Sequence, residues 1–356
     1  MISYMLRALE LARCGVGKVS PNPMVGAVIV VDGEVIGEGY HQKYGEAHAE
    51  VNAINSVEDK ELLKRATMYV TLEPCSHWGK TPPCADLIVE MGIPRVIVGS
   101  IDYNEKVCGQ GIAKMRQAGV DVTVGELEQE CIELNKRFFT SHTKGRPYVI
   151  LKWAQTADGA LDARNDARQK PAWLTGEEGR RIVHGLRARE DAIIVGRRTV
   201  EMDNPSLTVR YAEGENPIRI TIDRNLRLSP DYNIFDNQSD TILFTSIENI
   251  IPAVDKFRHN HRVSIEPFTD LRGLLCALLS RKIHSLIVEG GAVLLNSFID
   301  AQLWDEAMVF TSPMTTNELY DEKGIITTAP SSIGRDLLRS SDKVGDAVLN
   351  RYLCSY

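Results

Sequence analysis

Three side chains that zinc prefers as ligands constrain the first part of this chain more than any other feature. His48 stands two residues before Glu50, and Cys75, which follows Pro74, and Cys84 come later in the chain. One imidazole and two thiolates can fill three of the four tetrahedral positions around zinc and leave the fourth for water. The chain must therefore fold so that these three side chains meet, with a carboxylate close by to handle the protons of that water.

A closed, structural zinc site is the alternative. Such sites usually have four protein ligands, and the fourth would here have to be His41 or His77. We favour the catalytic interpretation, because a His-x-Glu motif and a Pro-Cys motif occur together and in this order. A metal-bound water at such a site becomes a nucleophile near neutral pH.

The pattern resembles that of the zinc-dependent cytidine and nucleobase deaminases, in which H-x-E is followed by P-C-x-x-C. Eight residues separate Cys75 from Cys84 here, and this longer loop is similar to that of the bifunctional riboflavin-biosynthesis deaminase/reductases. The resemblance implies that His48, Cys75 and Cys84 bind Zn²⁺ and that Glu50 is the catalytic proton shuttle.

Four more residues match positions that contact the deaminase substrate in that family. Asn22 lies in the segment PNPMVGA, and its amide offers both a donor and an acceptor to a pyrimidinone. By the same resemblance His41, His77 and Lys80 also contact the substrate, and Lys80 pairs with its ribose 5′-phosphate. On composition alone, the last three would be ordinary solvated residues.

Hydrophobic periodicity predicts alternating strands and helices in residues 1–145, and this pattern is typical of a three-layer α/β/α sandwich. The resemblance makes that domain cytidine-deaminase-like. We expect strands at 25–31, 34–39, 66–72, 95–100 and 121–124, and helices at about 2–14, 47–55, 84–91, 109–118 and 127–142. A polar stretch with Gly and Pro at 142–147 marks the domain boundary.

Residues 146–356 are expected to form a second α/β domain, whose topology does not follow from periodicity. Four segments in it resemble the reductase half of the same enzymes, whose fold is like that of dihydrofolate reductase: LKWAQTADG (151–159), WLT (173–175), DNPSLTVR (203–210) and VEGG (288–291). Neither domain has a G-x-G-x-x-G after its first strand, which argues against a Rossmann site.

The resemblance implies NADPH as the cofactor of this second domain. A strand that ends in two glycines before a helix can bring backbone N–H groups to a phosphate, and arginine side chains match phosphate oxygens. The implied NADPH-binding residues are Ala154, Trp173, Thr199, Asp203, Gly290 and Gly291. The implied substrate-binding residues are Lys152, Arg187, Leu207, Arg210 and Glu289. The chain departs from the family pattern at Pro171, at 196–199 and at 312–317.

Charge and hydropathy narrow the class of partner. The net charge of −7 is spread along the chain, without the basic surplus that is typical of nucleic-acid binders. No apolar run approaches the roughly 20 residues that span a membrane, and the first ten residues do not read as a signal peptide. An odd number of scattered cysteines, seven, argues against a disulfide framework. The sequence therefore predicts a cytoplasmic protein that acts on small molecules.

The resemblance implies a bifunctional enzyme of riboflavin biosynthesis. The first domain would deaminate 2,5-diamino-6-ribosylamino-4(3H)-pyrimidinone 5′-phosphate, and the second would use NADPH to reduce the ribosyl group of 5-amino-6-(5-phosphoribosylamino)uracil to ribityl. One alternative is a nucleobase or tRNA deaminase with a non-catalytic C-terminal domain, which predicts a short Cys-x-x-Cys and a basic surface. Another is a non-catalytic regulator, which should lack Glu50. Homo-oligomerisation stays open.

Overall fold

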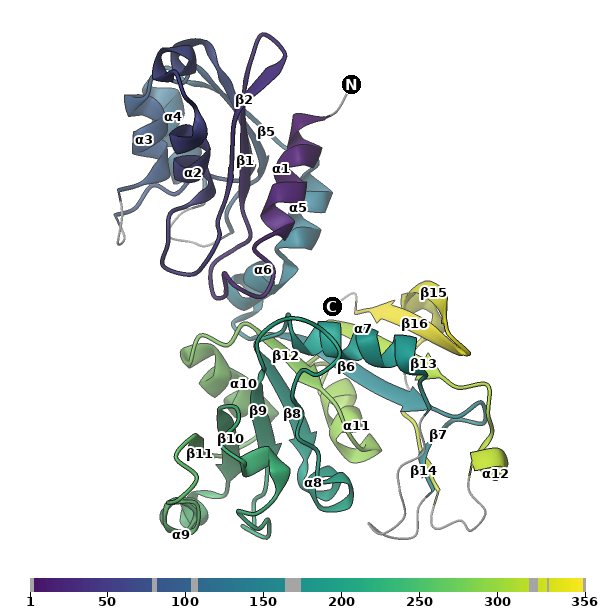
Figure 1. The fold of residues 1–356 in the computed structure, drawn as a ribbon. Helices are drawn as coiled ribbons and strands as arrows, with labels where there is room; N and C mark the ends of the chain where they lie inside the picture. The colour runs from purple at the N-terminus through teal and green to yellow at the C-terminus, as the bar shows by residue number, and fades with distance from the viewer. Residues whose placement is uncertain are drawn as a thin grey trace. The chain divides into compact units, whose positions relative to one another are not determined.

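The chain divides into two compact units in the computed structural model, Met1–Arg146 and Pro147–Tyr356. The structure describes residues 3–78, 82–103, 108–163, 174–319, 326–331 and 333–354. Each unit has its own large β-sheet with helices packed on it (Figure 1). Among the described residues, no helix has both the length and the apolar character needed to cross a bilayer.

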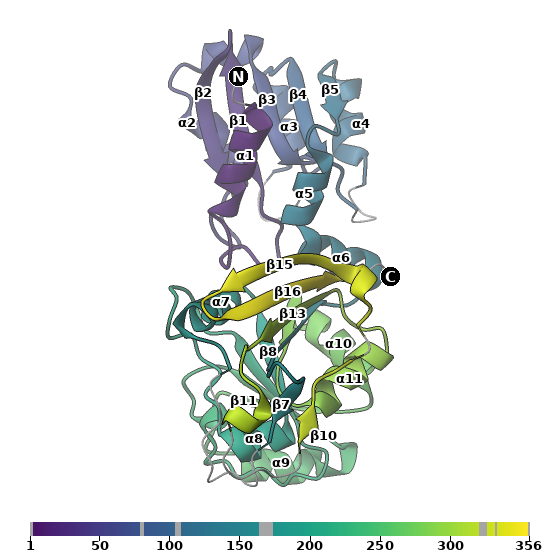
Figure 2. The same cartoon turned by 90° about the vertical axis from the view of Figure 1, so that its right-hand side faces the viewer.

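The sheet of the first unit has five strands in the order β2-β1-β3-β4-β5 (Figure 2). The strands are β1 (Gly26–Val31), β2 (Glu34–Tyr40), β3 (Thr67–Leu72), β4 (Arg95–Ser100) and β5 (Asp121–Val124). β1 runs antiparallel to β2 and β3, whereas β3, β4 and β5 are parallel to one another. The helices are α1 (Tyr4–Arg13), α2 (Ala49–Ser56), the 3₁₀ segment η1 (Lys60–Arg65), α3 (Cys84–Glu90), α4 (Gln110–Gln117), α5 (Glu128–Leu134) and α6 (Lys136–Lys144).

Helices cover both faces of this sheet, and β1 is therefore buried along its whole length. Alternate residues of β1 point to opposite faces. Ile29 belongs to the core that packs beneath α2, α3 and α4, and Val28 belongs to the smaller core with Met5 and Leu9 of α1. Figures 1 and 2 show these helices on the two sides of the sheet. The expected cytidine-deaminase-like three-layer sandwich is confirmed.

The single helix expected at 127–142 is wrong, because the structure has two helices there, α5 and α6. They meet at Asn135, whose backbone leaves the helical region (φ −106°, ψ 20°). The Asn135 side chain accepts a hydrogen bond from the Met24 amide (2.8 Å) and donates one to the Met24 carbonyl (2.9 Å). Local periodicity could not reveal this break, since its partner lies 111 residues earlier in the chain.

The main sheet of the second unit has nine strands in the order β11-β10-β9-β8-β12-β6-β13-β16-β15. Its strands are β6 (Tyr148–Gln155), β8 (Ala192–Gly196), β9 (Ile218–Ile222), β10 (Thr241–Thr245), β11 (Val263–Pro267), β12 (Ser285–Val288), β13 (Glu306–Thr311), β15 (Leu338–Val344) and β16 (Ala347–Leu353). Pairing is parallel from β11 to β13, and β16 and β15 join antiparallel. Strands β7 (Ala160–Asp162) and β14 (Thr327–Thr328) form a separate pair.

Helices also cover both faces of the second sheet. They are α7 (Glu177–Arg187), α8 (Arg197–Asp203), α9 (Ile250–Lys256), α10 (Leu271–Ser280), α11 (Ala292–Asp300) and α12 (Thr316–Leu319), with 3₁₀ segments η2 (Asn233–Phe235), η3 (Ile247–Asn249) and η4 (Arg335–Leu337). Leu278 and Phe298 of α10 and α11 share one core with Val149, and Val183 of α7 shares the other with Ile150. The expected dihydrofolate-reductase-like α/β domain is confirmed.

The edge strand β15 had no counterpart among the elements expected from the sequence. Its residues, LRSSDKV, are mostly polar. Five of the seven are exposed, Ser340 is half-buried, and only Val344 is buried. An exposed edge strand of this kind carries little hydrophobic alternation, which is the signal on which a strand prediction depends. Its place in the sheet comes from pairing with β16.

Gly26 allows α1 to approach β1 closely. A Cβ at this position would lie 2.0 Å from the Ala8 carbonyl oxygen and 2.9 Å from the Ala12 amide nitrogen. We therefore expect Gly26→Ala to lower the free energy of unfolding of the first unit by about 2 kcal/mol, because two backbones would have to separate. Chemical denaturation followed by circular dichroism measures this change.

Gly185→Ala is the matched control. Gly185 lies within α7, and a Cβ there would meet nothing within 4 Å. Alanine is the better helix former, so stability should stay unchanged or rise by up to about 1 kcal/mol. Equal destabilisation by the two substitutions would contradict the steric argument.

Candidate active sites

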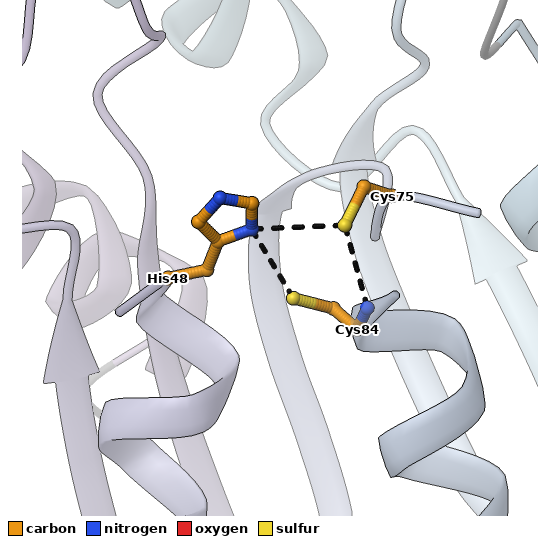
Figure 3. Close-up of side chains that lie close together, drawn as sticks. All are labelled: His48, Cys75 and Cys84. Carbon is orange, nitrogen blue, oxygen red and sulfur yellow. Dashed lines mark hydrogen bonds between the residues drawn. The ribbon is translucent and has the colours of Figure 1, made fainter. Parts of the chain in front are cut away.

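The first unit brings His48, Cys75 and Cys84 together, as the sequence predicts (Figure 3). His48 is the N-cap residue of α2, and Cys84 is the first residue of α3. The ligand atoms all lie within 4.8 Å of one another. His48 Nδ1 is 3.6 Å from Cys75 Sγ and 3.3 Å from Cys84 Sγ.

These distances fit a zinc ion. Zinc–ligand bonds of about 2.0–2.3 Å in a tetrahedron put neighbouring ligand atoms about 3.5 Å apart. The Cys84 amide also donates a hydrogen bond to Cys75 Sγ over 3.3 Å. Hydrogen bonds from the Cys84 thiol, and next from His48, hold the pKa of the Cys75 thiol below its ordinary value. A lowered thiol pKa favours the thiolate that binds metal.

Glu50 lies in the first turn of α2, two residues after His48, and its side chain is buried. Burial raises the pKa of the Glu50 carboxyl to about 7. A carboxyl group with a pKa near neutrality can both accept and release a proton during a reaction. The environment of Glu50 is therefore suited to moving protons beside the three ligands.

Asn22 and His41 lie together next to the ligand cluster. His41 Nδ1 is 3.0 Å from the Ala47 carbonyl oxygen, so this nitrogen carries the proton, and His41 Nε2 accepts from the Asn22 amide over 3.0 Å. Burial lowers the pKa of His41, which favours the neutral ring. Its ring meets that of His48 edge-on, with centroids 5.4 Å apart. Because protein groups occupy both nitrogens, His41 is poorly placed to be a fourth metal ligand.

The other two expected substrate-binding residues of the deaminase are His77 and Lys80. His77 has an exposed side chain two residues after Cys75. Lys80 lies outside the described residues, as do Trp173 and Pro171 in the second unit. The structure therefore adds nothing to the predictions for these three positions.

Glu73 is a residue near the site that the sequence did not single out. It precedes Pro74 and Cys75, and its buried carboxylate accepts hydrogen bonds from four backbone amides. Oε2 accepts from residues 102 and 109 (3.2 and 2.9 Å), and Oε1 accepts from residues 111 and 112 (2.9 and 3.3 Å). The carboxylate thus joins the chain just before Cys75 to the start of α4. A Glu directly before Pro-Cys was the available signal, but its donors lie far away in the sequence.

The carboxyl ends of parallel strands β6, β8 and β12 lie at one edge of the second sheet, where ligands of open α/β sheets usually bind. Lys152, Arg187 and Glu289 meet there. Arg187 Nη2 is 3.0 Å from Glu289 Oε2, and Lys152 Nζ is 3.8 Å from Glu289 Oε1. All three side chains are largely buried, and burial lowers the pKa of Lys152. The structure therefore clusters three of the five expected substrate-binding residues.

Leu207 and Arg210, the other two, lie in the segment after α8. Leu207 is buried and has a left-handed backbone (φ +55°), whereas the side chain of Arg210 is exposed. Arg187 Nη1 donates to the Thr208 carbonyl over 3.4 Å, which ties this segment to the charge cluster. The Arg210 amide donates to Nδ1 of His184 over 3.0 Å. His184, a buried residue of α7, was not among the expected site residues.

The backbone at Gly290-Gly291 fits a phosphate group. Gly290 has φ +112°, and a Cβ there would lie 2.7 Å from Thr199 Oγ1, so these two expected NADPH residues are adjacent. Gly291 is the N-cap residue of α11, and a Cβ on it would meet nothing within 4 Å. Free N–H groups at such a helix start attract phosphate. Ala154 lies near the end of β6, and Asp203 is the last residue of α8.

The four hydrogen bonds to Glu73 predict that its negative charge stabilises the first unit. Glu73→Gln would turn an NH₂ group towards backbone donors, so we expect the free energy of unfolding to fall by about 2 kcal/mol in urea titrations. The control is Glu61→Gln, which removes an exposed ion pair with Lys64 and should cost under about 0.5 kcal/mol. A Glu73→Gln protein as stable as this control would contradict the prediction.

Comparison with known proteins matches both units to domain families. Residues 2–100 match the cytidine and deoxycytidylate deaminase zinc-binding region, and residues 147–327 match the RibD C-terminal domain. The second match gives no support to the alternative in which the C-terminal domain is non-catalytic. The matched ranges contain the two clusters described above.

Relatives and solved structures match along almost the whole chain. The riboflavin biosynthesis protein RibD of Aquifex aeolicus is 41% identical, over 89% of this chain and 88% of that protein. RibD of Escherichia coli is 38% identical, over 91% and 90%. The structure of a diaminohydroxyphosphoribosylaminopyrimidine deaminase/5-amino-6-(5-phosphoribosylamino)uracil reductase from Thermotoga maritima covers 99% of this chain and 98% of its own, with 38% identity and a TM-score of 0.84. The chain belongs to the RibD family of bifunctional riboflavin-biosynthesis deaminase/reductases.

Proposed function

We propose that residues 1–145 carry the deaminase activity and residues 146–356 the reductase activity of this enzyme. We propose the substrates that the name of the Thermotoga maritima protein gives: the diaminopyrimidine ribose phosphate for the first domain and 5-amino-6-(5-phosphoribosylamino)uracil for the second. The observation that carries the proposal is the convergence of one imidazole, two thiols and a buried carboxyl in the first unit.

In the deaminase domain, His48, Cys75 and Cys84 would hold Zn²⁺. When bound, the cation supplies Lewis acidity that lowers the pKa of a water molecule towards 7. Glu50 takes a proton from the attacking water and passes it to a ring nitrogen of the pyrimidine. It then takes the second proton from the hydroxyl that has been added to the ring carbon and gives it to the amino group, which leaves as ammonia. The buried position and raised pKa of Glu50 support this role.

Asn22, His41, His77 and Lys80 orient the substrate of the deaminase. Asn22 offers its amide to the polar edge of the pyrimidinone, and His41 holds that amide through its Nε2. Because His41 Nδ1 is committed to the Ala47 carbonyl, the neutral ring keeps Nε2 as an acceptor. Lys80 pairs with the ribose phosphate, and His77 contacts the substrate at the start of the same loop.

When bound to the reductase domain, NADPH would supply the hydride that reduces C1′ of the ribosyl group. The residues that bind the cofactor are Ala154, Trp173, Thr199, Asp203, Gly290 and Gly291. The residues that contact the substrate are Lys152, Arg187, Leu207, Arg210 and Glu289. Arg210, whose guanidinium is exposed, suits the phosphate. The ion pairs of Glu289 hold Arg187 and Lys152 at the edge of the sheet where the ribose would lie.

Both domains would then recognise the same ribose phosphate, since the product of the first reaction is the substrate of the second. We further propose that the partners of the protein are pyrimidine ribose phosphates rather than nucleic acids, and that it works in the cytoplasm. The even spread of its negative charge supports the first of these statements.

Glu50→Gln tests the deaminase proposal. We expect ammonia release to fall by roughly 10²–10⁴-fold, because the amide cannot carry protons. Zinc content and NADPH oxidation with the deaminated substrate should stay unchanged. Coupled assays and elemental analysis measure the three quantities, with the exposed Glu58→Gln as control. Ammonia release close to wild type would remove Glu50 from this role.

Removal of zinc separates the two activities. A chelator should abolish ammonia release and leave NADPH oxidation with deaminated substrate intact, because the proposed metal ligands all lie in the first unit. Added zinc should restore ammonia release. Deamination by protein that is free of zinc, or loss of both activities together, would contradict the assignment.

A further inference from the structure

Two side chains of α7 hold the segment that contains Leu207 and Arg210. His184 Nδ1 accepts from the Arg210 amide over 3.0 Å. One turn later in the helix, Arg187 donates to the Thr208 carbonyl over 3.4 Å. The ring of Tyr211 packs edge-on against His184, with centroids 4.9 Å apart. Side chains of α7 thus form hydrogen bonds with the main chain on both sides of residue 209, at the Thr208 carbonyl and at the Arg210 amide.

This segment needs such anchors because its backbone is strained. Asn204 and Leu207 both have left-handed backbones (φ +41° and +55°). The left-handed region is unfavourable for a residue with a Cβ and persists only where the surroundings enforce it. Asn204 is held by two hydrogen bonds with Asn233 (2.7 and 2.8 Å). At the other end of the segment, the hydrogen bond from the Arg210 amide to His184 holds the backbone in the same way.

The hydrogen bond requires a neutral imidazole. A ring nitrogen that accepts has no proton, so Nε2 carries the proton of His184. Burial, and next the positive charges of Arg187 and Arg210, lower the pKa of His184 to about 4. Glu289 opposes this shift, and Lys152 adds to it. At neutral pH the acceptor is therefore present.

We infer that His184 is a positioning residue of the reductase reaction, whose neutral Nδ1 holds the Arg210 main chain and thereby places the Arg210 guanidinium at the substrate phosphate. The inference rests on the proposed assignment of Arg210 to the substrate. His184 acts through Arg210, and its own contact with the substrate is not required.

Two substitutions distinguish the role of His184 as a hydrogen-bond acceptor from the packing of its ring. His184→Phe keeps a ring and loses the acceptor, whereas His184→Asn keeps an acceptor oxygen on Cγ and loses the ring. We expect His184→Phe to raise the KM for the reductase substrate by roughly 5- to 10-fold, as for the loss of one hydrogen bond. Its kcat and its KM for NADPH should change less than about 2-fold, and His184→Asn should stay close to wild type.

The pH dependence gives a second readout. The pKa of His184 lies below its ordinary value, so the contact is complete above about pH 6.5 and weakens as the pH falls towards 4. The KM of the wild type should therefore rise towards that of His184→Phe below about pH 5. His184→Asn should lack this component, although the substrate phosphate titrates equally in both proteins.

Hydrogen exchange of residues 204–211, measured by mass spectrometry on protein without substrate, tests the positioning directly. Faster exchange in His184→Phe but not in His184→Asn supports the inference, whatever the enzyme acts on. His184 lies in the second unit, so an unchanged KM for NADPH serves as the measure that this unit is intact. Unchanged KM and exchange in His184→Phe, or equal defects in both variants, would overturn the inference. A different outcome would count against the proposed function alone: the two variants differ in exchange as expected, but the wild type does not oxidise NADPH with the proposed substrate.

Discussion

The first domain depends on two helices that begin at the same edge of one sheet. His48 is the N-cap residue of α2 and Cys84 is the first residue of α3, so both ligands lie at helix starts (Figure 3). The Cys84 amide donates a hydrogen bond to Cys75 Sγ, and the pKa of the Cys75 thiol lies below its ordinary value, which favours the thiolate. Cys75 lies in the turn after β3. Glu73 holds that turn in place by accepting hydrogen bonds from four backbone amides.

In the second domain, the site is built from buried charged side chains. Arg187, Glu289 and Lys152 are taken out of water at the carboxyl edge of the sheet, and desolvation offsets much of what their attraction contributes to stability. This cost of burial supports the proposed role of the cluster in substrate binding. Its link to Thr208 couples the charges to the strained segment that contains Leu207. Both domains thus place their polar groups where strands end and helices begin.

Much of the fold could be predicted because its signals are local. Short runs rich in apolar and β-branched residues predict the five strands of the first sheet, and the motifs around His48 and Cys75 predict its ligands. The order of the nine strands in the second sheet could not be predicted in this way. Strand order depends on which edges pair, and sequence periodicity describes only the two faces of a strand.

The sequence by itself determined the chemistry that this protein can perform. The metal-ligand types, the carboxyl two residues after His48 and the reductase segments are all short motifs of neighbouring residues. The tertiary structure alone decided how those groups are held. Asn135 breaks a helix to bind Met24, and His184 meets the amide of Arg210 26 residues later. These contacts join residues distant in the chain, and only packing of the whole domain brings their hydrogen-bonding groups within reach.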